Sequence, residues 1–190
     1  MIASLLHGKY SQVQFLTEKP TANFLSQEEF LRDIDDYRFL NDVFIGVGNN
    51  IARRRIFDRL VAVGVTPTNC VADSAFVAHN AELGSGIVVC PGAVIMANAR
   101  LGNNVIINTL SSVDHDCLVG NHSQVTAGVT FGGTTRVGEN CFFGIKSATV
   151  PGVTVGDNTI VMAGSLVTRD APSGVMLGGS PAAIMRRITA

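Results

Sequence analysis

A six-residue repeat runs through most of the chain and constrains its fold more than any other feature. At every sixth position from Val71 to Val167, sixteen of the seventeen residues are apolar, although hydrophobic residues make up only 46% of the chain. The seventeen are Val71, Val77, Leu83, Val89, Ile95, Leu101, Ile107, Val113, Val119, Val125, Phe131, Val137, Phe143, Thr149, Val155, Val161 and Val167. Two residues before these positions, from Ala75 onward, only Ala, Ser, Cys, Thr, Val and Ile occur. Such an unbroken register predicts a stacked, repetitive architecture.

Glycines add a second period of eighteen residues. They are Gly84, Gly102, Gly120, Gly138 and Gly156. Because strand side chains alternate, the apolar position and the small residue two places earlier face the same interior. The other residues of each hexad turn a corner, so three short strands and three corners form one triangular coil, and coils stack about 4.8 Å apart. The sequence predicts a mainly β protein, with a parallel β-helix at 67–172 and a C-terminal tail at 173–190.

Residues 1–66 follow a different pattern, which predicts a small α/β unit ahead of the β-helix. Short β-rich runs occupy 13–17 and 42–48. Between them, Ser26 and Glu29 have the spacing of a helix-capping box. Alternation of strand and helix indicates a small parallel sheet of Rossmann-like character.

The second helix of this unit is expected directly after the sequence GVGNN at 46–50. Its expected apolar face consists of Ile51, Ile56, Leu60 and Val63, and Gly64 ends it. The free N–H groups and the dipole at such a helix start favour an anion. A tight strand-to-helix turn that needs glycine is the alternative interpretation.

Composition and charge exclude several classes of partner. The formal net charge is −1 and no run of Lys or Arg occurs, so neither nucleic acid nor an anionic membrane surface is an expected partner. No stretch approaches the length of a membrane span, and the apolar run at the start is too short for a signal peptide. The cysteines lack C-x-x-C spacing, which predicts buried thiols in a reducing compartment and hence a cytoplasmic protein. They are Cys70, Cys90, Cys117 and Cys141.

A histidine between two carboxylates stands out within the sequence NTLSSVDHDCLVG at 108–120. His115 is the third residue of the hexad counted from Val113, so it occupies neither inward position. It is therefore expected on a corner, projecting outward. Either a solvated corner or a site built against another surface is consistent with this position.

The repeat resembles that of the hexapeptide-repeat acyltransferases, whose prism is a left-handed β-helix. The order of a small α/β unit and then a prism, with the sequences FIGVGNN, NTLSSVDHDCLVG, FFGIKSATVPGV and GVMLGGSPA, narrows the resemblance. The chain is similar to sugar acetyltransferases related to the UDP-4-amino-sugar N-acetyltransferase of bacillosamine synthesis and to sialic acid O-acetyltransferases. The resemblance implies homotrimers in which the N-terminal unit holds a nucleotide sugar and the prism holds acetyl-CoA.

The chain departs from that family at its beginning. Family members usually open with a strand and a phosphate loop rich in glycine and histidine, whereas this sequence is expected to start inside the helix that would follow the loop. Either the loop is absent or the start codon is placed too late. The resemblance therefore assigns more of the nucleotide-sugar contact to Gly48 and its neighbour Asn49.

Catalytic roles follow from the same resemblance. It makes His115 of the DHDC sequence the general base, with Asp116 orienting the ring and raising its basicity. Asn108 matches a family asparagine close to the acceptor. A histidine with a pKa near 6.5, raised somewhat by a carboxylate, suits removal of a proton from an attacking sugar amine or hydroxyl at neutral pH.

Acetyl-CoA contacts can be transferred only where motifs match. The resemblance assigns them to Gly133, Ile145 and Ala163 along the pantetheine groove. Gln124 occupies the place of a second, CoA-contacting histidine in a relative; glutamine can form a hydrogen bond there but cannot carry charge.

Several functional interpretations remain open at this point. The expected reaction is acetylation of an amino group on a nucleotide-linked sugar, in first place a UDP-4-amino-dideoxy sugar. O-acetylation of the sialic acid type and a non-catalytic β-helix scaffold are alternatives. A zinc site of the γ-carbonic anhydrase kind is not expected, because His79 and His115 lie two coils, about 10 Å, apart within a chain. No metal is therefore expected.

Overall fold

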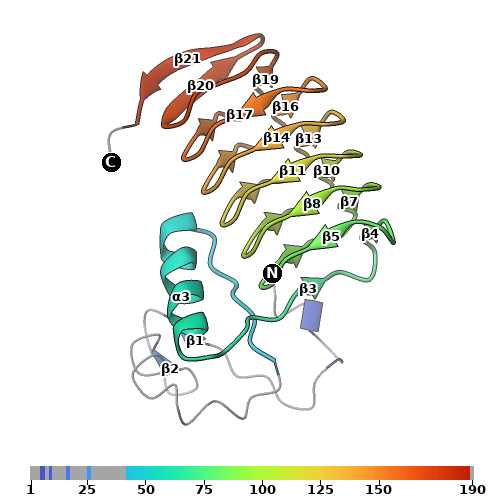
Figure 1. Cartoon of the computed structure of the whole chain (residues 1–190), viewed down its shortest axis with the longest axis vertical. Helices are drawn as coiled ribbons and strands as arrows, with labels where there is room; N and C mark the ends of the chain where they lie inside the picture. The colour runs from blue at the N-terminus through green and yellow to red at the C-terminus, as the bar shows by residue number, and fades with distance from the viewer. Residues whose placement is uncertain (1–4, 7–8, 10–15, 18–24, 27–41, 189–190) are drawn as a thin grey trace.

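The computed structural model describes residues 5–6, 9, 16–17, 25–26 and 42–188, and a stack of short strands forms most of that part (Figure 1). The strands of the stack are β3 (Cys70–Val71), β4 (Phe76–Val77), β5 (Glu82–Leu83), β6 (Val88–Val89), β7 (Val94–Ile95), β8 (Arg100–Leu101), β9 (Ile106–Ile107), β10 (Ser112–Val113), β11 (Leu118–Val119), β12 (Gln124–Val125), β13 (Thr130–Phe131), β14 (Arg136–Val137), β15 (Phe142–Phe143), β16 (Ala148–Thr149), β17 (Thr154–Val155), β18 (Ile160–Val161) and β19 (Leu166–Val167). The predicted parallel β-helix is confirmed.

The strands form three sheets, and the chain visits the sheets in turn. Sheet 1 contains β3, β6, β9, β12, β15 and β18; sheet 2 contains β4, β7, β10, β13, β16 and β19; sheet 3 contains β5, β8, β11, β14 and β17. Each residue pairs in parallel with the residue eighteen places later, as Val119 does with Val137. The turns between sheets define three corners, named corner 1–2, corner 2–3 and corner 3–1.

The interior of the prism is filled by the side chains that the six-residue repeat predicts. From Val89 to Val167 every sixth residue is buried, as is the small residue two places before each. The polar exception, Thr149, is 5% exposed; its Oγ1 lies 2.9 Å from Thr135 Oγ1 and accepts the Gly132 N–H at 3.2 Å. A buried hydroxyl with hydrogen-bond partners avoids the penalty of an unsatisfied polar group. The predicted register is therefore confirmed.

One residue of every corner between positions 86 and 164 has a left-handed backbone, again at a six-residue interval. Glycine occupies five of these positions, and the others are Asn98, Asn104, Leu110, Asp116, His122, Thr134, Asn140, Lys146 and Asn158. Glycine, Asn and Asp tolerate this conformation, whereas Leu, Lys and the β-branched Thr adopt it at a steric cost. The fold therefore constrains residue type at this corner position.

The N-terminal unit differs from its prediction within the described residues. β1 (Leu16–Thr17) pairs in parallel with β2 (Leu25–Ser26), and the helix expected after Ser26 falls in 27–41, outside the described residues. The strand expected at 42–48 is wrong, because this segment has no strand assignment. The Val43 carbonyl accepts the N–H of Thr68 at 2.7 Å, a single bond that does not by itself make a strand ladder.

The predicted helix after 46–50 is present as α3 (Asn50–Ala62). The Asn49 side chain caps its start by accepting the Ala52 N–H at 3.0 Å. Its end is a Schellman motif: Gly64, at φ +82°, donates to the Val61 carbonyl, and Val65 donates to Leu60. Gly64 therefore ends the helix as predicted.

The predicted buried face of α3 is wrong in part. Arg53, Phe57 and Leu60 are its buried residues, whereas Ile51 is 57% exposed. Arg53 faces inward because the prism surface opposite it offers carbonyl oxygens. Its guanidinium donates at 2.7–3.3 Å to the carbonyls of Val47, Gly48, Asn104 and His122 and to Asn50 Oδ1. Burial lowers the pKa of Arg53 to about 10, so it is charged at neutral pH.

The tail closes the C-terminal end of the prism. β20 (Val175–Gly179) pairs in parallel with β18, and β21 (Ala182–Arg187) turns back antiparallel along β20. Both strands extend sheet 1, at the opposite end of the stack from β3 (Figure 1). Within the described residues, no helix has both the length and the apolar character needed to cross a membrane.

The register makes a direct prediction about stability. Val119 is 3% exposed inside the prism, so Val119→Asp should lower the free energy of unfolding by more than about 4 kcal/mol, because an unpaired charge becomes buried. Thr130→Asp, at an exposed strand position, serves as the matched control and should cost less than about 1 kcal/mol. Denaturant unfolding curves that coincide for the two variants would contradict the register.

Candidate active site

His115 and Asp116 form an exposed pair on corner 2–3, between β10 and β11. The Nδ1 atom of His115 lies 2.7 Å from Asp116 Oδ2, and the two side chains are 56% and 48% exposed. Asp114 has a different partner, because its Oδ1 accepts the backbone N–H of His115 at 2.7 Å. The predicted outward, corner position of His115 is therefore what the structure shows.

Electrostatics prepare the ring to accept a proton. The hydrogen bond to Asp116, followed by the charge of Asp114, raises the pKa of His115 above its ordinary value. The pKa of Asp116 is lowered, first by His115 and then by a hydrogen bond from Asn98. An ionised carboxylate only accepts hydrogen bonds, so Nδ1 of the neutral ring carries the proton and Nε2 has a free lone pair. Nε2 is the atom that can act as a base.

Gly133 lies directly against this ring from the next coil. A Cβ atom at position 133 would lie 2.5 Å from His115 Nε2 and 2.7 Å from Cε1. The residue is buried, and its backbone is not in the left-handed region. With the His115 ring in this position, only glycine fits at residue 133 without displacing the ring. The structure brings Gly133 and His115 together.

Asn108 lies on corner 1–2, at the other edge of sheet 2 from His115. Its Oδ1 accepts the N–H of Thr109 at 2.7 Å, which stabilises the turn. Within one chain, Asn108 and His115 are thus separated by the width of a sheet.

Two of the predicted acetyl-CoA residues line one apolar groove. Ile145, 52% exposed, and the exposed Ala163 lie on successive coils of corner 1–2. The groove has a volume of about 460 Å³ and is lined by Thr126, Phe142, Gly144, Ile145, Ile160, Val161, Met162 and Ala163. Its lining is almost wholly apolar, and so suits a thioester arm better than a charged group.

Gln124 lies on the outer face of sheet 1, yet it is only 9% exposed. Its Oε1 atom is buried and has no hydrogen-bond partner among the described residues. Phe142, which lines the groove, is its pairing neighbour in β15. Buried amide oxygens are normally paired with a hydrogen-bond donor. The Gln124 side chain lies one strand from the groove.

Gly48 and Asn49 lie together at the start of α3. Asn49 is committed to capping the helix, whereas the fold places no demand on Gly48. A Cβ atom there would have nothing within 4 Å, and its backbone is not left-handed. Neither close packing nor a special turn therefore accounts for a glycine at this position.

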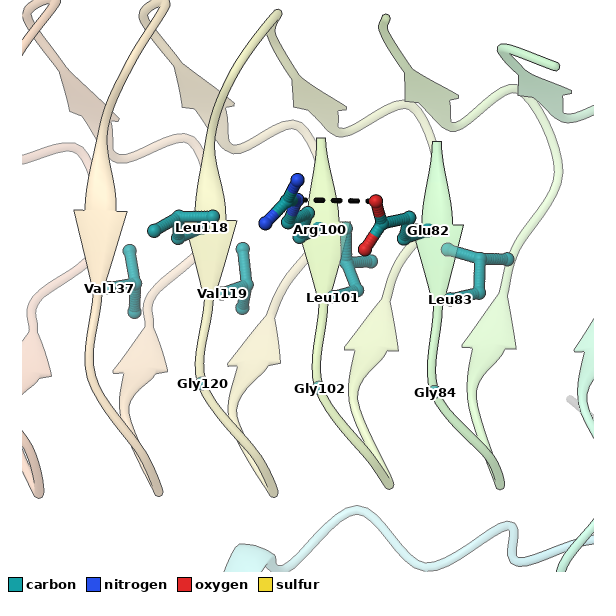
Figure 2. A pocket seen from close by; sticks show the side chains of 10 residues that line it. All are labelled: Glu82, Leu83, Gly84, Arg100, Leu101, Gly102, Leu118, Val119, Gly120 and Val137. Carbon is teal, nitrogen blue, oxygen red and sulfur yellow. Dashed lines mark ion pairs between the residues drawn. The ribbon is translucent and has the colours of Figure 1, made fainter. Parts of the chain in front are cut away.

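A second hollow lies on the outer face of sheet 3 and contains none of the predicted site residues (Figure 2). Arg100 and Glu82 form an ion pair across it, with Arg100 Nε 3.4 Å from Glu82 Oε1. Figure 2 shows Gly84, Gly102 and Gly120 in a row on neighbouring strands. A Cβ at any of these glycines would approach the next coil within 2.5 Å, so the eighteen-residue glycine period reflects close coil stacking.

Among the described residues, no three His, Cys, Asp or Glu side chains gather into a group that could hold a metal ion. His122 is buried on corner 3–1, with its Nδ1 2.9 Å from Asn104 Nδ2 and its ring 5.5 Å from that of Phe57. Burial lowers its pKa, in contrast to that of His115. All four cysteines are buried, as predicted.

Comparisons with known proteins agree with the fold. The family model described as the hexapeptide repeat of succinyl-transferase matches residues 134–169. GDP-perosamine N-acetyltransferase of Escherichia coli O157:H7 is 26% identical over 89 residues, which cover 47% of this chain and 40% of that protein. The match thus spans less than half of the curated relative.

Solved structures match nearly the whole chain. PerB from Caulobacter crescentus, in complex with CoA and GDP-perosamine, is 30% identical with a TM-score of 0.89, covering 97% of this chain and 91% of PerB. The acetyltransferase domain of PglB from Neisseria gonorrhoeae, in complex with acetyl coenzyme A, is also 30% identical, with a TM-score of 0.87 and the same coverage. The chain belongs to the hexapeptide-repeat sugar acetyltransferases, the β-helix family of these two proteins.

The contact between Gly133 and the histidine ring predicts a separation of activity from stability. Gly133→Ala should change the free energy of unfolding by less than about 1 kcal/mol, because the exposed ring can rotate away from the added methyl. Acetyl transfer should fall at least about 10-fold, since the ring is displaced from its position. A Gly133→Ala variant with full activity would show that the position of the His115 ring against residue 133 is unimportant for acetyl transfer. Thermal unfolding of the variant is the control for its stability.

Proposed function

We propose that the protein transfers the acetyl group of acetyl-CoA to an amino group of a nucleotide-linked sugar, with His115 as the general base. The observation that supports this most is the exposed His115–Asp116 pair, in which Nδ1 is engaged and Nε2 is free. PerB and PglB, whose structures hold CoA with GDP-perosamine and acetyl coenzyme A, support the choice of donor and acceptor.

Each catalytic residue has a defined task in this proposal. The neutral sugar amine attacks the thioester carbonyl, His115 Nε2 takes the proton that the amine loses, and CoA leaves as its thiolate. The proton then passes to that thiolate, which gives the amide and free CoA. Asp116 keeps the ring in the required tautomer. General-base catalysis of this kind contributes about 10²–10⁴-fold, and Asn108 is proposed to lie close to the acceptor.

The apolar groove on corner 1–2 is the proposed site of the pantetheine arm. Ile145 and Ala163 would contact it, and the unsatisfied Gln124 Oε1 would accept a hydrogen bond from one of its amides. Gly133 would contribute backbone contacts beside His115. Gly48 and Asn49, at the open start of α3, are proposed to contact the nucleotide sugar.

We propose a homotrimer, and the division of these residues between two corners supports a site shared between subunits. His115 lies on corner 2–3 and the groove on corner 1–2, at opposite edges of sheet 2, so a complete site requires the corner of one subunit beside the groove of another. We place the trimer in the cytoplasm, because four buried thiols without C-x-x-C spacing suit a reducing compartment.

The reaction can be tested by measuring CoA release from acetyl-CoA with four acceptors: UDP- and GDP-linked 4-amino sugars and their 4-hydroxy counterparts. Release is expected with an amino sugar and not with its hydroxy partner, and His115→Ala should lower turnover at least 10²-fold. Activity with only the UDP-linked or only the GDP-linked amino sugar would identify the nucleotide. Wild-type turnover by a folded His115→Ala variant would exclude the proposed base.

Sharing of the site between subunits has its own test. His115→Ala and Ala163→Trp, which blocks the groove, should each be inactive alone. Co-assembled at equal amounts, they should recover about a quarter of wild-type activity, since half the bases and half the grooves are intact. Light scattering should give three times the 20.0 kDa subunit mass. An inactive mixture of trimers would place the site within one chain.

A further inference from the structure

A row of polar side chains runs along corner 2–3 and ends on the catalytic pair. Asn80 Nδ2 donates to Asn98 Oδ1 at 2.8 Å, and Asn98 Nδ2 donates to Asp116 Oδ1 at 3.0 Å. The other carboxylate oxygen of Asp116 contacts His115 Nδ1 at 2.7 Å. The three residues stand eighteen apart, so each lies one coil above the last.

The direction of these hydrogen bonds follows from chemistry. Asp116, as an ionised carboxylate, can only accept, so the Asn98 amide must present its N–H₂ group to it. Its carbonyl oxygen then faces the opposite way, toward Asn80, which in turn must donate. The carboxylate thus fixes the orientation of both amides, and both oxygens of Asp116 are held.

The backbone permits this row because Asn98 and Asp116 have left-handed conformations, with φ of 59° and 58°. Another pair with the same corner position, Asn140 and Asn158, also forms an amide ladder, with Asn140 Nδ2 2.8 Å from Asn158 Oδ1. That pair lies on corner 3–1, away from His115. It provides a matched comparison for a ladder with no catalytic partner.

We infer that Asn98, itself oriented by Asn80, is a positioning residue that fixes the Asp116 carboxylate and through it the His115 ring. This inference rests on the proposed role of His115. An isolated exposed Asp–His pair loses much of its alignment to side-chain rotation, whereas a carboxylate held at both oxygens keeps one orientation.

The charged surroundings of the ring are simple, which makes a pH readout informative. Asp114 and Asp116 are the ionisable neighbours on its own corner. The adjoining coils place Ala97 and Asn98 on one side and Gly133 and Thr134 on the other, and none of these four side chains titrates. A charge introduced at position 98 would therefore be the only new one facing the pair.

The test uses two substitutions that the left-handed backbone tolerates, Asn98→Gly and Asn98→Asp, with Asn140→Gly as the matched control. Asn98→Gly removes the donor and should lower kcat about 3–10-fold without changing KM for acetyl-CoA. Asn98→Asp keeps the shape but adds a negative charge, which favours protonated His115. The acidic limb of the kcat/KM profile should move to higher pH by about 0.3–0.7 unit. Asn140→Gly should change neither.

The outcomes separate this inference from the proposed function. If His115→Ala abolishes turnover while both Asn98 variants have the kcat and pH profile of the wild type, the positioning role is overturned and the base stands. A loss of kcat in Asn140→Gly equal to that in Asn98→Gly would also overturn it, since the effect would then be general to corner ladders. If His115→Ala keeps wild-type turnover, both the base and its positioning residue are excluded.

Discussion

Parallel pairing of each residue with the one eighteen places later is the constraint on which the whole molecule depends. The backbone ladder brings equivalent residues of successive coils to one strand spacing, so side chains in the same column touch. The column through the third hexad position puts the His115 ring against Gly133, and the next column puts Asn98 on Asp116. The His115–Asp116 pair, to which we assign catalysis, is thus aligned by the stack itself.

The parts of the fold that depend on this pairing could be predicted from the sequence, and the parts that depend on other contacts could not. An inward position repeats with the coil, so even the polar Thr149 is buried in register with its apolar neighbours. The face of α3 was mispredicted because hydrophobic spacing cannot reveal that the surface opposite a helix consists of carbonyl oxygens. Arg53 is buried there as a cation surrounded by acceptors. The strand expected at 42–48 is wrong for a related reason, since β-propensity alone does not place a segment in a sheet.

The site was predictable to a different degree at each residue. The corner position of His115 follows from counting hexads, and its exposure agrees. Gly133 and Gln124 were named by resemblance alone; the structure adds a steric reason for the glycine and an unsatisfied oxygen for the glutamine. Asn98 was missed, although its signal was present as polar residues eighteen apart. It lies outside the apolar and glycine columns of the repeat, but polar columns on exposed corners carry the same information.

The C-terminal hairpin of β20 and β21 has a consequence for end-to-end association between molecules. A stack of parallel coils ends in unpaired N–H and C=O groups, and these groups can pair with the end of another stack. Because β21 runs antiparallel to β20, an incoming coil meets the wrong hydrogen-bond pattern there. Its outer edge also carries exposed Arg186 and Arg187. Reversal of this strand therefore disfavours end-to-end continuation of sheet 1 at the C-terminal end of the stack.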